Sequence, residues 1–238
     1  MQIFDLLGLV AVFSVIQSIF GVGLLLFGTP TLLLMGFSYS ETLWLLLPCS
    51  LSISFIQTIG NYGLVQAKKK VAYISIPTMA ITLTIIITYD QVIDISKIVG
   101  FFLLSIGVVK FSPRLQAHLQ SFIKRRLQVY YFIIGFVHGI SNMGGGPLSI
   151  LMSTVYNDQL KIRSNIAFFY LILALFQLAV LFIIETGTIQ TYNFFLIMTS
   201  VLVYFLTNRF LAHKVNDEKY MWLINVLILI YGALAIIQ

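Results

Sequence analysis

The stretch SNMGGGP, residues 141–147, decides how this chain folds, because it interrupts an apolar run with three consecutive glycines and a proline. The run before the break, Val129 to Asn142, has 14 residues and makes about 21 Å of helix, which is shorter than the roughly 30 Å hydrocarbon core of a bilayer. The break is therefore expected inside a membrane. Free backbone N–H and C=O groups are tolerated there only where protein or a wet cavity covers them, so the break predicts a functional site.

The composition of the whole chain is that of a membrane protein. Of its 238 residues, 59% are hydrophobic and 9% are charged, and the mean hydropathy is +0.99, whereas about a quarter of the residues in a soluble domain are charged. Long apolar runs that predict spanning helices cover residues 2–22, 41–66, 71–89, 95–111, 164–184, 190–208 and 220–237. Two shorter, broken elements cover residues 29–38 and 129–156. We predict an all-α polytopic integral membrane protein with about 8–10 membrane segments.

The two broken elements are related by an internal repeat. A shift of 117 residues superimposes Gly28 on Gly145 and Pro30 on Pro147. The repeat predicts a first transmembrane unit at residues 1–111 and a second at residues 129–238. Residues 112–128 join them as a basic linker, which we expect to lie as an amphipathic segment on the cytoplasmic face.

The basic residues predict how the two units face. If each break tops a hairpin, 13 of the 14 Lys and Arg residues lie inside and only Lys97 lies outside, as the positive-inside rule prefers. An odd number of crossings per half then makes the repeats inverted, a common plan of secondary transporters, with both termini outside. If the second break lay within one crossing, the halves would be parallel and five of these residues would move outside. The positive charge thus indicates topology, and no nucleic-acid partner is expected.

The helix that resumes after the break offers an anion site without a charged side chain. Pro147 lies near its first turn, where a missing N–H costs nothing, and the preceding glycines let backbone approach a ligand closely. Free N–H groups and the helix dipole attract anions. The candidate residues are Ser141, Asn142, Gly144, Gly145, Gly146 and Pro147, with Gly28, Thr29 and Pro30 as their first-half equivalents. In the inverted arrangement these helix starts converge near the midplane. The alternative is that the glycines only permit close helix packing.

Polar residues also mark the helices that follow the breaks. Ser50, Ser54, Gln57 and Asn61 are spaced so that they form one stripe on a helix, and we expect this stripe to face a cavity rather than lipid. Ser50, Gln57 and Asn61 are binding candidates in the first half, and Asn165 is one in the second. Packing alone is the alternative role of such residues.

His138 is a titratable side chain that lies inside the predicted bilayer, four residues before Asn142. Intramembrane ionisable residues are functional candidates, here for proton transfer or coupling. The alternative is a neutral His that is hydrogen-bonded to a neighbouring helix. The sequence has no Walker loop, zinc-ligand spacing or Ser-His-Asp set, so we expect no enzyme, no metal and no cofactor.

Two segments carry a resemblance to a known family. GFVHGISNMGGGPLSILMSTVYNDQLKIRSNIAFFYL, residues 135–171, resembles the second repeat of the sulfite exporter TauE/SafE family, in which a G-x-G-G-G-x-x-x-P-type motif opens each half. GVGLLLFGTPTLLLMGFSYSETLWLLLPCSLSISFIQTIGNYG, residues 21–63, resembles the first repeat. The resemblance implies a membrane transporter for small sulfur-containing anions such as sulfite or organosulfonates.

The expected setting and direction follow from these predictions. The partners are a small anionic substrate, the lipid bilayer and a second copy of the chain in a homodimer, and the location is a prokaryotic plasma or inner membrane. An inside-negative potential drives anions outward, so export needs no coupling ion. The alternatives are a membrane assembly or chaperone subunit without transport, and a proton-coupled anion importer.

Overall fold

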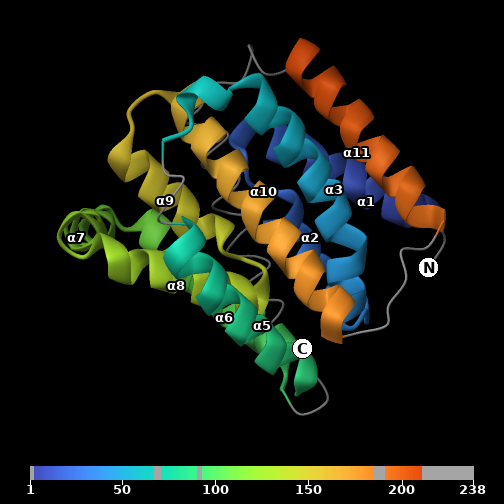
Figure 1. Cartoon of the computed structure of the whole chain (residues 1–238), viewed down its shortest axis with the longest axis horizontal. Coiled ribbons are helices and arrows are strands. Elements are labelled where there is room, and N and C mark those ends of the chain that lie inside the picture. Colours follow the sequence, from blue (N-terminus) through green and yellow to red (C-terminus); the bar gives the residue numbers. More distant parts are fainter. Residues whose placement is uncertain (1–2, 67–70, 90–92, 185–190, 211–238) are drawn as a thin grey trace.

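The computed structural model describes residues 3–66, 71–89, 93–184 and 191–210 (Figure 1). Within these ranges every regular element is helical and no strand occurs. The first half contains α1 (Ile3–Phe20), α2 (Leu24–Leu34), α3 (Tyr39–Gly60), η1 (Tyr62–Leu64), η2 (Val71–Ser75), α5 (Ile76–Thr88) and α6 (Ile95–Phe111). The rest contains α7 (Pro113–Arg125), α8 (Leu127–Ser141), α9 (Gly145–Val155), α10 (Gln159–Ile184) and α11 (Thr191–Phe210). The all-α fold class is confirmed, and the predicted run at 220–237 lies outside the described residues.

Length and composition divide the helices into two groups. In the described part of the chain α1, α3, α10 and α11 are long and apolar enough to cross a bilayer, and the pair α6 and α7, bent by 102°, would make a fifth span. The helices α2, α8 and α9 are apolar but shorter, as the two broken elements require. The total of 8–10 membrane segments stays a prediction.

The two longest helices form the centre of the molecule. Figure 1 shows α3 and α10 side by side, and they pack against each other. Around them α1 packs on α11, and α8 packs on α5. Close approach of α8 to α5 depends on Gly135 and Gly139, four residues apart, because a Cβ on either would overlap η2 or α5.

The packing repeats between the halves. In element order α1, α2, α3 and α5 correspond to α8, α9, α10 and α11, and α2 and α9 each have 11 residues. The first helix of each set of four packs on the fourth helix of the other set, as α1 on α11 and α8 on α5. Two copies of one ancestral unit are expected to pack on each other in this reciprocal way. That one half is inverted relative to the other across the membrane stays a prediction.

The position of the first break differs from the prediction. The helix α2 begins at Leu24, so Gly28, Thr29 and Pro30 lie inside it and do not open it. The break consists of residues 21–23, where Gly21 has a left-handed φ of 73°. The helix starts Leu24 and Gly145 are therefore 121 residues apart, and the predicted register of 117 is wrong. The prediction failed because it took Pro30 as a first-turn proline, whereas the chain tolerates it within the helix.

The basic linker is a helix. Pro113 opens α7, and the Ser112 hydroxyl caps it by accepting a hydrogen bond from the N–H of Leu115. The side chain of Ile123 is buried on the inner face of α7, whereas Lys124 and Arg125 are exposed. The segment is thus amphipathic, as expected, and its cytoplasmic location stays a prediction.

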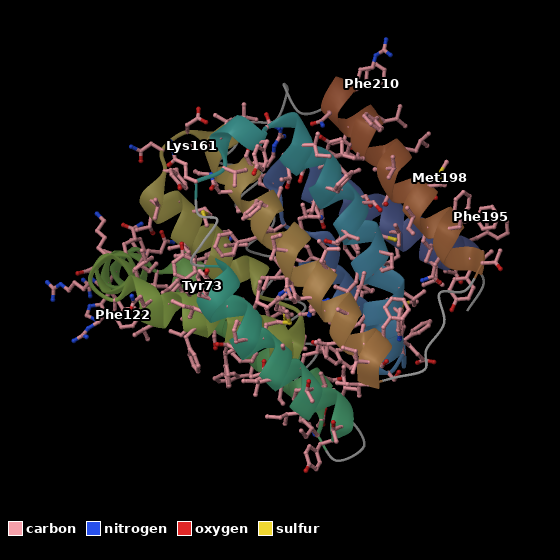
Figure 2. The ribbon with its side chains drawn as sticks, in the orientation of Figure 1. Tyr73, Phe122, Lys161, Phe195, Met198 and Phe210 are labelled. Carbon is pink, nitrogen blue, oxygen red and sulfur yellow. The ribbon has the colours of Figure 1, made fainter. Side chains whose placement is uncertain are left out.

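The outer surface suits a lipid environment. Figure 2 shows Phe195, Met198 and Phe210 projecting from α11 away from the rest of the chain. About half of each side chain is exposed, at 53%, 54% and 57% respectively. Apolar side chains that are exposed along a whole helix are favourable in hydrocarbon and costly in water, so this face indicates contact with a bilayer.

Candidate functional site

The two breaks are built in the same way. Asn142 ends α8 with a left-handed φ of 59°, as Gly21 ends α1 with a φ of 73°. In each case the N–H of that residue donates to a carbonyl four residues earlier at 2.8 Å, which belongs to His138 in α8 and to Gln17 in α1. Glycine and asparagine reach this conformation at low cost, which explains why they end these helices.

The start of α9 leaves backbone N–H groups unused. No side chain caps Gly144, and the first N–H groups of a helix have no acceptor within it. Pro147 is the third residue of α9, where its missing N–H leaves no carbonyl without a partner, and its own carbonyl accepts a hydrogen bond from Tyr130 at 3.0 Å. The N–H groups of Gly144 and Gly145 thus have no acceptor within the helix.

The polar side chains of His138, Tyr170 and Gln177 lie around this helix start, together with that of Asn142 in the turn before it. The side chains of His138 and Tyr170 meet edge to face, with ring centroids 5.8 Å apart. A Cβ on Gly144 would lie 2.9 Å from His138 Nδ1, and one on Gly145 would overlap the Tyr170 hydroxyl. Gln177 lies beside the His138 ring.

These polar atoms are buried without hydrogen bonds of normal geometry. They are both ring nitrogens of His138, the Tyr170 hydroxyl, both amide atoms of Gln177 and the Oδ1 atom of Asn142. Leaving a buried donor or acceptor unsatisfied costs about 1–3 kcal/mol. Such a cluster beside the N-terminus of a helix is a candidate site for a polar ligand.

The two breaks come together in the core. Val22 of the first break lies against the start of α9, 3.2 Å from the position a Cβ would take on Gly145. Asn142 of the second break donates from Nδ2 to the Thr29 hydroxyl of α2 at 3.0 Å. The predicted convergence of α2 and α9 therefore holds within the protein, and Thr29 is in contact with the site although it does not open its helix.

The equivalent cluster of the first half is largely satisfied by its own hydrogen bonds. Gln17 Nε2 donates to the Ser50 hydroxyl at 3.0 Å and to the Ser54 hydroxyl at 3.2 Å. Gln57 Nε2 donates to the Ser18 carbonyl at 3.1 Å. The stripe of Ser50, Ser54 and Gln57 is buried, as expected, but it faces α1 rather than a cavity.

Other predicted residues have structural partners. Asn61 is the C-cap of α3, and its amide donates to the Gln57 carbonyl at 3.3 Å. Asn165 links α10 to the end of η1 and to the segment after it. Its Oδ1 accepts a hydrogen bond from the Gln66 N–H, and its Nδ2 donates to the Leu64 carbonyl. Their role as binding residues stays a prediction.

Three predicted residues contact packing neighbours. The Ser141 hydroxyl donates to the Val137 carbonyl of its own helix at 2.7 Å. A Cβ on Gly28 would meet Leu46, and one on Gly146 would overlap Ile106. At Gly28 and Gly146 the geometry therefore matches the alternative of close helix packing.

Sequence reasoning missed Gln17 and Tyr170. Gln17 lies four residues before Gly21, as His138 lies four residues before Asn142, so the register of the two turns would have revealed it. Tyr170 lies seven residues before Gln177, hence on the same face of α10. An aromatic residue in an apolar helix gives no signal until its hydroxyl is seen near Gly145.

The electrostatics of the site suit an anion. In the described part of the chain the carboxylates are Asp5, Glu41, Asp94 and Asp158, and all four are exposed. The buried site thus contains donor groups and the positive end of a helix but no described carboxylate. The described residues contain no group of His, Cys, Asp and Glu able to hold a metal ion.

A multi-pass helical protein with an uncharged polar site at a broken helix has the architecture of a secondary transporter. The chain belongs to the sulfite exporter TauE/SafE family, whose model matches residues 6–235. Membership confirms the resemblance seen in the sequence. It implies a membrane transporter for sulfur-containing anions such as sulfite. Searches of curated proteins and of solved structures found no match to the chain.

Proposed function

We propose that the protein exports small sulfur-containing anions, sulfite or organosulfonates, across a prokaryotic plasma or inner membrane by uniport. The substrate binds at the start of α9, between the N–H groups of Gly144 and Gly145 and the side chains of Asn142, His138 and Tyr170. The observation that carries the proposal is the set of buried, unsatisfied polar atoms around this helix start. An oxyanion accepts several hydrogen bonds at once, so it can satisfy the donors of the set, which are the Tyr170 hydroxyl, the Gln177 amide nitrogen and a protonated ring nitrogen of His138. The amide oxygens of Asn142 and Gln177 are acceptors and do not bind it.

The direction follows from the membrane potential. For a monovalent anion, an inside-negative potential of 100 mV contributes about 2.3 kcal/mol to efflux, which corresponds to roughly a 50-fold outward gradient. A carrier without a coupling ion therefore exports such an anion without a further energy source.

Flux measurements in proteoliposomes test the proposal. The purified protein is given a panel of sulfite, an organosulfonate, sulfate and chloride, with and without a proton gradient. We expect flux of a sulfur-containing anion that is independent of the proton gradient. Flux that requires the gradient would indicate the proton-coupled importer, and no flux of any anion would favour the assembly or chaperone subunit. The expected homodimer is tested by the mass of the protein in detergent.

A further inference from the structure

The end of α1 is occupied by the guanidinium of Arg163. Arg163 lies half-buried near the start of α10, and its Nη1 donates to the Ser18 carbonyl at 3.2 Å. Gln57 donates to the same carbonyl at 3.1 Å. The last carbonyls of a helix carry partial negative charge, so a cation is stabilised at this position.

No buried carboxylate of the described residues neutralises Arg163. The carboxylates in that part of the chain are exposed, whereas Arg163 is half-buried and its hydrogen bond goes to a neutral carbonyl. Among the described residues, the negative partner of the guanidinium is the C-terminal end of α1.

The atoms around Arg163 resemble the ligand set of a coupling cation. In transporters with broken helices, carbonyls at the ends of half-helices coordinate Na⁺ near the substrate site. Here α1 ends at a break, and the Gln57 Oε1 atom beside its last turn is buried without a hydrogen bond. Two oxygen atoms that could bind a cation are thus present at the end of α1, and the guanidinium donates to one of them, the Ser18 carbonyl.

Arg163 is also connected to the anion site. Arg163 and Tyr170 are seven residues apart on α10, about 10 Å along one face. Between them, Gly21 packs against the Arg163 carbonyl and Ile166, and the next residue, Val22, touches the start of α9. A movement of the first break, residues 21–23, would therefore change the surroundings of both the Arg163 guanidinium and the anion site at the start of α9.

We propose that Arg163 is a tethered cation that takes the place of a diffusible coupling cation at the end of α1. It is a positioning residue, and it makes anion transport independent of Na⁺. This inference rests on the proposed transport function. Removing the guanidinium should leave the Ser18 carbonyl and the Gln57 amide oxygen able to bind Na⁺.

The test compares Arg163→Gln, Arg163→Lys and the control Lys161→Gln. Lys161 lies near the start of α10 at the rim of the molecule (Figure 2), with its ammonium 5.0 Å from the Tyr156 ring centroid and not at α1. Sulfite flux is measured in Na⁺ and in choline. Wild type, Lys161→Gln and Arg163→Lys should show the same flux in both media. Arg163→Gln should lose roughly tenfold in choline, as expected for a lost charged hydrogen bond, and should recover part of it in Na⁺.

A second readout does not need transport. The melting temperature in detergent without anion should rise with Na⁺ for Arg163→Gln and not for wild type. If Arg163→Gln shows neither Na⁺-dependent flux nor Na⁺ stabilisation, the inference is overturned. It is also overturned if wild-type flux requires Na⁺, which is measured without any variant. A wild-type protein that carries no anion would contradict the proposed function, while Na⁺ stabilisation would still decide the role of Arg163.

Discussion

At the scale of single residues, the two halves differ in chemistry at equivalent places. Gln17 corresponds to His138 in the register of the turns, and Gln57 corresponds to Gln177 at a separation of 120 residues. The first pair has hydrogen bonds between α1 and α3, whereas the atoms of the second pair lie side by side without hydrogen bonds of normal geometry. The same fold therefore stabilises one break with its own side chains and leaves the other able to take a ligand.

The Tyr170 hydroxyl should contribute to substrate affinity. Tyr170→Phe keeps the ring against His138 but removes the hydroxyl beside Gly145. A lost hydrogen bond to an anion costs about 1.5–3 kcal/mol, so KM for sulfite should rise roughly tenfold or more with little change in maximal rate. The control is Tyr130→Phe, whose hydroxyl donates to the Pro147 carbonyl. Tyr130→Phe should lower thermal stability without a comparable rise in KM. An equal rise in KM for both variants would show that the Tyr170 hydroxyl has no specific role in binding.

His138 should bind the anion rather than carry a proton. Its side chain lies beside Gly144 at the start of α9, and its ring nitrogens have no hydrogen bond of normal geometry. We predict that His138→Ala raises KM but still transports, with a flux that increases when a potassium diffusion potential is made more negative inside. Electroneutral wild-type transport that disappears in His138→Ala would instead identify a proton-coupled carrier.

At the scale of elements, one hydrogen bond compensates for a proline in the central helix. Pro48 has no N–H, so the Trp44 carbonyl four residues earlier lacks its helical partner. Asn193 of α11 donates to this carbonyl at 2.8 Å. This bond fastens α11 to α3 and satisfies a backbone group that hydrocarbon would leave without a partner.

A double-mutant cycle tests this compensation. Asn193→Leu should lower the unfolding free energy by about 1–3 kcal/mol, because it leaves the Trp44 carbonyl buried and unsatisfied. In a Pro48→Ala background, the restored N–H of residue 48 can donate to the Trp44 carbonyl. Asn193→Leu should then lower the unfolding free energy much less. Thermal unfolding in detergent measures both costs, and equal costs in the two backgrounds would show that Asn193 acts by another contact.

The elements also show what a sequence can predict and what it cannot. The break at 142–144 and the helix after it were predicted because SNMGGGP combines a left-handed position, free N–H groups and a first-turn proline. The first break was misplaced because GVG, residues 21–23, is short and Pro30 looked equivalent to Pro147. Gln17 and Tyr170 were missed because their role depends on contacts between helices, which periodicity within one helix does not report.

At the scale of the whole molecule, the orientation of the halves is open to a direct test. The segment after α2 and the segment after α9 occupy equivalent places, and inversion puts them on opposite sides of the membrane. In a Cys49→Ala background, Met35→Cys should be labelled by an impermeant thiol reagent from outside, and Asn157→Cys from inside. Both positions are exposed. Labelling of both from outside would support parallel halves and contradict the inverted arrangement.

The sulfite-evoked current of proteoliposomes tests the anion site at the start of α9 most directly. It is compared among wild type, Gly145→Ala and Gly146→Ala. A Cβ on Gly145 displaces the Tyr170 hydroxyl from the site, whereas a Cβ on Gly146 displaces only the Ile106 side chain of α6. Wild type should carry a current that moves negative charge with sulfite, Gly145→Ala should lose most of it while inserting normally, and Gly146→Ala should keep the larger share. Equal currents in Gly145→Ala and wild type would contradict the account.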